Sequence, residues 1–197
     1  MLTMSRALGL AGGAALAASA FSAFSRLRYQ RSAIATLAEY GVRPIKKLNA
    51  RTSAADRLAR IASRPEPRRT LSFPIWSRRR YDVERREDDG MPVYCVRPHS
   101  ASDAVVVYLH GGGYISTASQ GQALLIDELT RRTGAGFIVP LYPLAPHHTW
   151  QEAHRLVLDL YSRTLSENPG KRIVLMGDSA GGGLAVVIAL SLAEQGS

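Results

Sequence analysis

The sequence contains few of the features that would assign it to a class of protein at once. It has one cysteine, Cys95, in 197 residues, so no disulfide can form within the chain. Cys95 lies in the apolar run MPVYCV, which indicates a small buried side chain rather than a reactive thiol. Zinc-finger spacings, RNA-binding motifs and interleaved surface aromatics are absent. We therefore expect no nucleic-acid partner, and the sequence implies no metal or cofactor.

Acidic residues are scarce in the first half of the chain. Residues 1–90 carry 18 Lys or Arg and 8 Asp or Glu, whereas residues 91–197 carry 7 and 8. The excess positive charge thus lies outside the half that holds the motifs described below. Such a distribution favours a membrane-flanking or solvated basic segment over a nucleic-acid groove.

Long hydrophobic runs are also rare, and one uncharged stretch stands out at residues 7–25. Its length suits a membrane span, but its large apolar side chains are few among Ala, Gly and Ser. Three interpretations stay open: a membrane anchor, a cleaved signal peptide, or a soluble helix that packs on the domain. Arg26, Arg28 and Arg31 follow the stretch, and they favour a cytoplasmic location for the residues after it if the stretch spans the membrane.

The remaining chain divides into two regions by texture. Residues 26–70 form a basic region, read as helix up to residue 65, with Thr52 or Ser53 as a helix cap and a proline-broken linker at 64–70. Residues 71–197 form the second of these regions. There a hairpin turning at residues 88–90 precedes three apolar strands, 104–109, 136–143 and 172–177, each followed by a helix.

This alternation predicts an α/β fold with parallel strands covered on both faces. We expect an apolar stripe on the helix that follows strand 104–109, and a buried face on the helix that follows strand 136–143. The stripe comprises Leu124, Leu125, Ile126 and Leu129, and the buried face comprises Trp150, Ala153, Leu156, Val157 and Leu160.

A serine lies on a glycine-flanked turn between the last strand and the last helix. Gly177-Asp178-Ser179-Ala180-Gly181 matches G-x-S-x-G in the strand-to-helix context that this motif requires. The glycines permit a sharp turn that holds the Ser179 hydroxyl at the carboxyl edge of the sheet. The following helix points its N-terminus at the site, which favours developing negative charge. Ser179 is therefore the candidate nucleophile.

A second glycine-rich motif follows the first apolar strand. His110-Gly111-Gly112-Gly113 allows main-chain N–H groups to approach an oxyanion without side-chain clash. The N–H group of Ala180, directly after the nucleophile, would be the other donor. A phosphate-binding loop is disfavoured because no Lys-Ser or Lys-Thr follows the glycines.

Together HGGGY, YPLAPHH (residues 142–148) and GDSAGGG resemble the hormone-sensitive-lipase-like family of α/β-hydrolase carboxylesterases over residues 80–197. The resemblance implies an α/β-hydrolase fold and a small acyl ester of short or medium chain as substrate. It also implies that Ser179 is the nucleophile and that residues 26–65 contribute to a cap. The implied oxyanion donors are Gly112, Gly113 and Ala180, and the implied supporting residues are His110, Gly111 and Asp178.

The sequence departs from this family after the nucleophile. The family places an Asp or Glu and then a His after the serine, but here all five histidines precede Ser179. The only acid after Ser179 is Glu194. We expect an N-terminal portion of a hydrolase with little activity of its own, whether it is a fragmentary record, a frameshift, a split gene or a decayed paralogue.

Other functions remain open at this point. They are a non-catalytic interaction protein, a membrane-associated basic protein whose function lies in residues 1–70, and a thioesterase, peptidase or amidase. The oligomeric state is also open.

Overall fold

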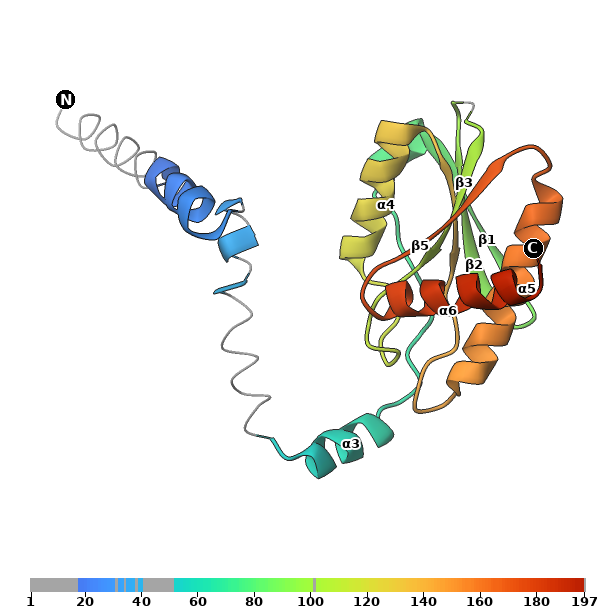
Figure 1. Ribbon diagram of the computed structural model, residues 1–197, viewed down its shortest axis with the longest axis horizontal. Helices are drawn as coiled ribbons and strands as arrows, with labels where there is room; N and C mark the ends of the chain where they lie inside the picture. Colours follow the sequence, from blue (N-terminus) through green and yellow to red (C-terminus); the bar gives the residue numbers. More distant parts are fainter. Residues whose placement is uncertain are drawn as a thin grey trace. The chain divides into compact units, whose positions relative to one another are not determined.

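The computed structural model describes residues 18–30, 32–33, 35–37, 39–40, 52–100 and 102–196 (Figure 1). The chain divides into two compact units, Met1–Arg60 and Ile61–Ser197. Residues 18–29 are helical, and a further helix, α3, spans Ala54–Ala62. The Ser53 hydroxyl accepts a hydrogen bond from the Asp56 N–H at 3.0 Å, so the predicted helix cap at Ser53 is confirmed.

The hydrophobic stretch at residues 7–25 is described only from residue 18 onward, and residues 7–17 lie outside the described part. Among the described residues, no helix combines the length and the apolar character needed to cross a bilayer.

The second unit contains a five-stranded sheet in the order β1-β2-β4-β3-β5. β1 pairs antiparallel with β2, and β2 pairs antiparallel with β4. β3 pairs in parallel with β4 on one side and with β5 on the other. The strands are β1 (Tyr81–Asp88), β2 (Met91–Pro98), β3 (Ala104–Leu109), β4 (Gly136–Pro140) and β5 (Arg172–Gly177). The predicted α/β-hydrolase arrangement, a hairpin followed by parallel strands, is confirmed.

The hairpin turn forms where the sequence predicts it. Asp89 and Gly90 both have positive φ, 50° and 76°, and they connect Asp88 of β1 to Met91 of β2. A tight two-residue turn with both central residues at positive φ matches the twist of the paired strands.

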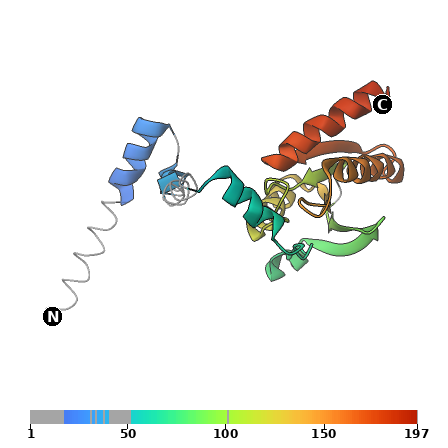
Figure 2. The same cartoon turned by 90° about the horizontal axis from the view of Figure 1, so that it is seen from below.

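Helices cover both faces of the sheet. α4 (Gln120–Thr133) packs on one face, whereas α5 (Trp150–Glu167) and α6 (Ala180–Glu194) lie side by side on the other (Figure 2). Ile126 of α4, Val157 of α5 and Ile188 of α6 are each fully buried against the strands. Alternate residues of the central strands point to the two faces, so the strands separate two hydrophobic cores.

Two expected helix faces need correction. Leu124 and Leu125 are exposed, and the buried side of α4 is formed by Ala123, Ile126, Asp127 and Thr130. Trp150, the first residue of α5, is also exposed. In both helices the buried residues keep the 3.6-residue period, but these three apolar residues are not part of the buried face.

β5 lies at the edge of the sheet and pairs with β3 alone. The apolar pattern alone predicts a buried strand here, whereas the missing later strands predict an edge strand, and the edge strand is what forms: Arg172 and Val174 are exposed and the other four residues are half-buried. Val174 in its centre is 41% exposed. In Figure 1, β5 runs from the connection after α5 at the upper right to the turn before α6 at the lower left.

Candidate active site

Ser179 lies in the turn between β5 and α6, with its side chain exposed. Its backbone has φ 49° and ψ −118°, a combination that residues other than glycine rarely adopt. Such a conformation costs on the order of 1–3 kcal/mol and is retained where the surrounding structure enforces it. The turn is the sharp strand-to-helix geometry expected for a serine nucleophile.

Two glycines make this turn sterically feasible. A Cβ atom on Gly177 would lie 2.4 Å from the main-chain carbon of Gly181. A Cβ atom on Gly181 would lie 2.0 Å from the carbonyl oxygen of Leu109, at the end of β3. The start of α6 therefore packs directly against the ends of both strands, and only glycine fits at either position.

The loop after β3 also depends on glycine. Gly112 has φ 140°, and a Cβ atom there would lie 2.3 Å from the carbonyl oxygen of Ser116. Gly113 has φ 63°, in the left-handed region. A Cβ atom on Gly111 would lie 2.3 Å from Oδ2 of Asp178. Because β3 and β5 are parallel neighbours, this loop and the Ser179 turn emerge at the same edge of the sheet.

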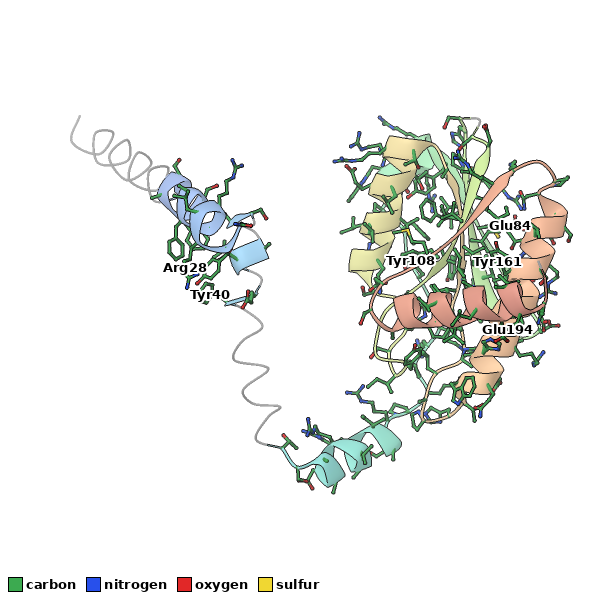
Figure 3. The ribbon with its side chains drawn as sticks, viewed as in Figure 1. Arg28, Tyr40, Glu84, Tyr108, Tyr161 and Glu194 are labelled. Carbon is green, nitrogen blue, oxygen red and sulfur yellow. The ribbon has the colours of Figure 1, made fainter. Side chains whose placement is uncertain are left out.

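Asp178 joins the two motifs. Its Oδ1 accepts hydrogen bonds from the Tyr108 hydroxyl at 2.6 Å and from the Gly111 N–H at 2.8 Å. Gln122 of α4 donates from Nε2 to Oδ1 and Oδ2, each at 3.1 Å. Tyr108 lies on the α4 side of the sheet (Figure 3). One carboxylate thus links β3, the glycine loop, α4 and the Ser179 turn.

These donors also set the charge of Asp178. Burial opposes ionisation of the carboxyl group, but the hydrogen bonds from Tyr108, Gly111 and Gln122 outweigh that effect and lower its pKa below the ordinary 3.8. Burial, reinforced by the bond to Asp178, raises the pKa of Tyr108. At neutral pH a carboxylate therefore accepts bonds from a neutral phenol and two N–H donors.

His110 is a buried residue at the start of the glycine loop. Its Nδ1–H donates to the carbonyl oxygen of Gly111 at 2.9 Å, and its ring stacks on Tyr142 with centroids 4.4 Å apart. The Tyr142 hydroxyl donates in turn to the His110 carbonyl oxygen. Burial lowers the pKa of His110, so the ring is held neutral.

The other four histidines have partners away from Ser179. His99 lies beside Asp82, and His147 beside the carbonyl oxygen of Arg64. His148 contacts the carboxylates of Glu66 and Glu152. His154 forms a hydrogen bond of 2.9 Å with Ser191. In the part of the chain that the structure describes, no histidine is hydrogen-bonded to Ser179 and no acid follows it except Glu194, which lies exposed on α6.

The sequence did not point to Tyr108 or Gln122. Tyr108 reads as one more apolar residue of a buried strand, and Gln122 as a polar residue in the first turn of a helix. A signal existed for Gln122, since Ser119 and Gln122 form a capping box that fixes where α4 starts. Within the described residues, no cluster of three or more His, Cys, Asp or Glu side chains could hold a metal ion.

Comparison of the sequence with known proteins also indicates an α/β hydrolase. Residues 106–197 match the model of a family described as alpha/beta hydrolase fold. The chain is 34% identical over 149 residues to LipR of Mycobacterium tuberculosis, which bears the name of an acetyl-hydrolase; the match covers 75% of this chain and 48% of LipR. It is 32% identical over 107 residues to mouse hormone-sensitive lipase, covering 51% of this chain and 14% of the lipase.

A solved structure has a similar fold. An esterase from the bacterial hormone-sensitive lipase family superposes with a TM-score of 0.55 at 25% identity, over 70% of this chain and 50% of that one. The fold is that of an α/β hydrolase. The chain is similar in sequence and in fold to esterases related to hormone-sensitive lipase. It spans about half the length of LipR.

Proposed function

We propose that this protein is a serine carboxylic ester hydrolase that acts through an acyl-enzyme on short- or medium-chain acyl esters. The observation that carries the proposal is the backbone of Ser179, a non-glycine residue at φ 49° between β5 and α6. This strain places a hydroxyl at the N-terminus of a helix, where an attacking serine and its oxyanion are stabilised. The names of relatives, including esterases and the ethyl acetate hydrolase of Pseudomonas putida, support the substrate class.

In the proposed reaction, the Ser179 hydroxyl attacks the ester carbonyl carbon and transfers its proton to a base. The carbonyl oxygen becomes an oxyanion, which accepts hydrogen bonds from main-chain N–H groups of Gly112, Gly113 and Ala180. One such donor is worth about 2.7–4 kcal/mol of transition-state stabilisation. The oxyanion then collapses, the base returns its proton to the leaving oxygen, and the alcohol departs while the acyl group stays on Ser179. Water gives a proton to the base, attacks the acyl carbon and releases the carboxylic acid, which restores the Ser179 hydroxyl.

Asp178 has a positioning role in this scheme. Through the Gly111 N–H it holds the glycine loop against the Ser179 turn. His110 is a structural residue rather than the base, because its Nδ1–H donates to the carbonyl oxygen of Gly111 and its ring stacks on Tyr142.

These 197 residues do not supply the base on their own, because no described histidine is hydrogen-bonded to Ser179. We therefore propose that this chain, tested alone, hydrolyses esters slowly. A small diffusible base would then take over the role of the absent histidine.

The test is hydrolysis of p-nitrophenyl butyrate by the chain and by Ser179→Ala, with and without added imidazole. Ser162→Ala, which alters an exposed serine of α5, is the matched control. We expect nearly equal rates without imidazole, and an imidazole-dependent gain above the rate of imidazole alone that Ser162→Ala keeps and Ser179→Ala loses. An equal gain in Ser179→Ala would refute the nucleophile. Fast Ser179-dependent hydrolysis without imidazole would instead show that one of the five histidines acts as base.

A further inference from the structure

A cavity lies at the end of the sheet opposite to Ser179. Its volume is about 590 Å³, and its walls come from the end of β2, the starts of β3 and β4, and the connection between α5 and β5. Lys171 immediately precedes β5, whereas Ser179 follows that strand. A strand of six residues is about 17 Å long, so the cavity and the Ser179 turn are separate sites.

The floor of the cavity is apolar. Cys95 of β2, Val105 of β3 and Ile138 of β4 line it, and they belong to the core that α5 covers. Their side chains are buried, with exposed fractions of 5–8%. An apolar chain that lay on this floor would leave water and gain roughly 0.8 kcal/mol for each CH₂ group that becomes buried.

The rim of the cavity is cationic. Arg86, Arg97 and Lys171 line it, and Glu167 is the one carboxylate among the described lining residues. Glu167 is already paired with Arg86, with 3.4 Å between Nη1 and Oε2.

Two cations thus remain available to a ligand. Arg97 pairs with Glu84, but both side chains are at least half exposed, and such surface pairs are weak. Lys171 forms no ion pair with any residue that the structure describes.

We propose that this cavity binds a small organic carboxylate with a short apolar tail, the carboxylate between Arg97 and Lys171 and the tail on Val105 and Ile138. An apolar floor with a net positive rim fits this class better than a neutral ligand or a bare inorganic anion. Arg97 offers the planar guanidinium that pairs with a carboxylate through two hydrogen bonds, and Lys171 adds a point charge.

The proposal does not depend on the proposed ester hydrolysis, since no residue of the Ser179 site lines the cavity. Its test therefore measures binding in the Ser179→Ala chain, where no turnover occurs. The probe is hexanoate. Hexanamide has the same tail without charge, and inorganic phosphate is an anion without a tail.

Binding is followed by ligand-observed saturation-transfer NMR. We expect a saturable hexanoate signal that hexanamide and phosphate fail to displace at equal concentration. Lys171→Gln and Arg97→Gln should each weaken binding several-fold. The control Arg155→Gln, which removes an exposed arginine of α5 that is not a lining residue, should leave it unchanged.

Equal binding of hexanamide, displacement by phosphate, or insensitivity to both substitutions would each overturn the proposal.

Discussion

The Asp178 carboxylate accepts a hydrogen bond of 2.8 Å from the Gly111 N–H, 67 residues away in the chain. Through this contact the turn that carries Ser179 and the loop that would hold an oxyanion share one anchor. The anchor is charged, because the pKa of Asp178 is lowered by its donors. Hydrogen bonds to a charged group contribute more than neutral ones. The charge of Asp178, and not only its shape, should therefore matter to stability.

Asp178→Asn keeps the shape and removes the charge, so it should lower the free energy of unfolding by about 1–3 kcal/mol. Urea denaturation measures this change. Asp159→Asn, which alters an exposed carboxylate paired with Arg155, is the control and should cost less than about 0.5 kcal/mol. Similar losses in the two variants would mean that the network around Asp178 contributes no more than a surface ion pair.

Glycine substitutions at the start of α6 should have opposite outcomes depending on position. Gly181→Ala places a methyl group 2.0 Å from the Leu109 carbonyl oxygen, which is backbone and cannot give way. We expect a loss of about 3 kcal/mol or failure to fold. Gly183→Ala meets only the Tyr114 hydroxyl, at 3.1 Å, and alanine favours a helix by roughly 0.5–1 kcal/mol over glycine.

The two substituted positions lie two residues apart in the same helix. The difference in stability between the two variants, measured by thermal unfolding, therefore isolates the steric effect. If Gly181→Ala were as stable as Gly183→Ala, α6 would not pack against β3 as closely as described.

Much of this architecture follows from local pattern. The hairpin turn at Asp89-Gly90 and the β5-to-α6 turn were predicted because glycine placement determines backbone geometry within a few residues. The cap at Ser53 was also predictable, because it depends on a hydroxyl that accepts a hydrogen bond from an N–H group only three residues along the chain. Strand order was not derivable from pattern alone, because pairing of β4 between β2 and β3 depends on contacts distant in sequence.

The sequence predicted the motifs of the site but not the hydrogen bonds that connect them. Ser179 and the glycine loop have sequence signatures, whereas the Asp178 bonds to Tyr108 and Gln122 join residues 56–70 positions apart. Trp150 shows the converse failure, since its helical spacing matched the buried face of α5 but its side chain, at the first position of the helix, is exposed.

His110 should make stability depend on pH in a defined window. Its pKa is lowered from 6.5 by burial, so the unfolded chain takes up a proton on His110 before the folded chain does. Stability from this residue is therefore fully present above pH 6.5 and falls as the pH drops toward the lowered value.

Proton NMR of the histidine Cε1 protons tests this directly, with the His110 signal assigned by its loss in His110→Gln. We expect a titration midpoint below 6.5. A midpoint at or above 6.5 would mean that the ring is charged or solvated in the folded state, contrary to its complete burial beside Tyr142.

The outer side of α6 should promote self-association. Val186, Val187 and Leu190 are 61%, 42% and 60% exposed, and β5 is the neighbouring edge strand. Contiguous exposed apolar surface and an open strand edge favour contact between chains. Val186→Lys combined with Leu190→Lys should reduce association in sedimentation velocity at rising concentration. Leu165→Lys on α5 is the control, and an equal effect from it would show that the α6 surface is not the contact.

Ser179 should be a position where function and stability conflict. At φ 49° and ψ −118° a side chain strains the backbone, whereas glycine does not. Ser179→Ala keeps the Cβ atom and thus the strain, but Ser179→Gly relieves it. We expect the glycine variant to be more stable than the alanine variant by about 1 kcal/mol, compared by urea midpoint at constant m-value. In an ordinary turn the order would be reversed, because glycine loses more conformational entropy on folding than alanine. An alanine variant as stable as the glycine variant would therefore mean that the backbone at this position relaxes, and the geometry that carries the proposed nucleophile would be lost with it.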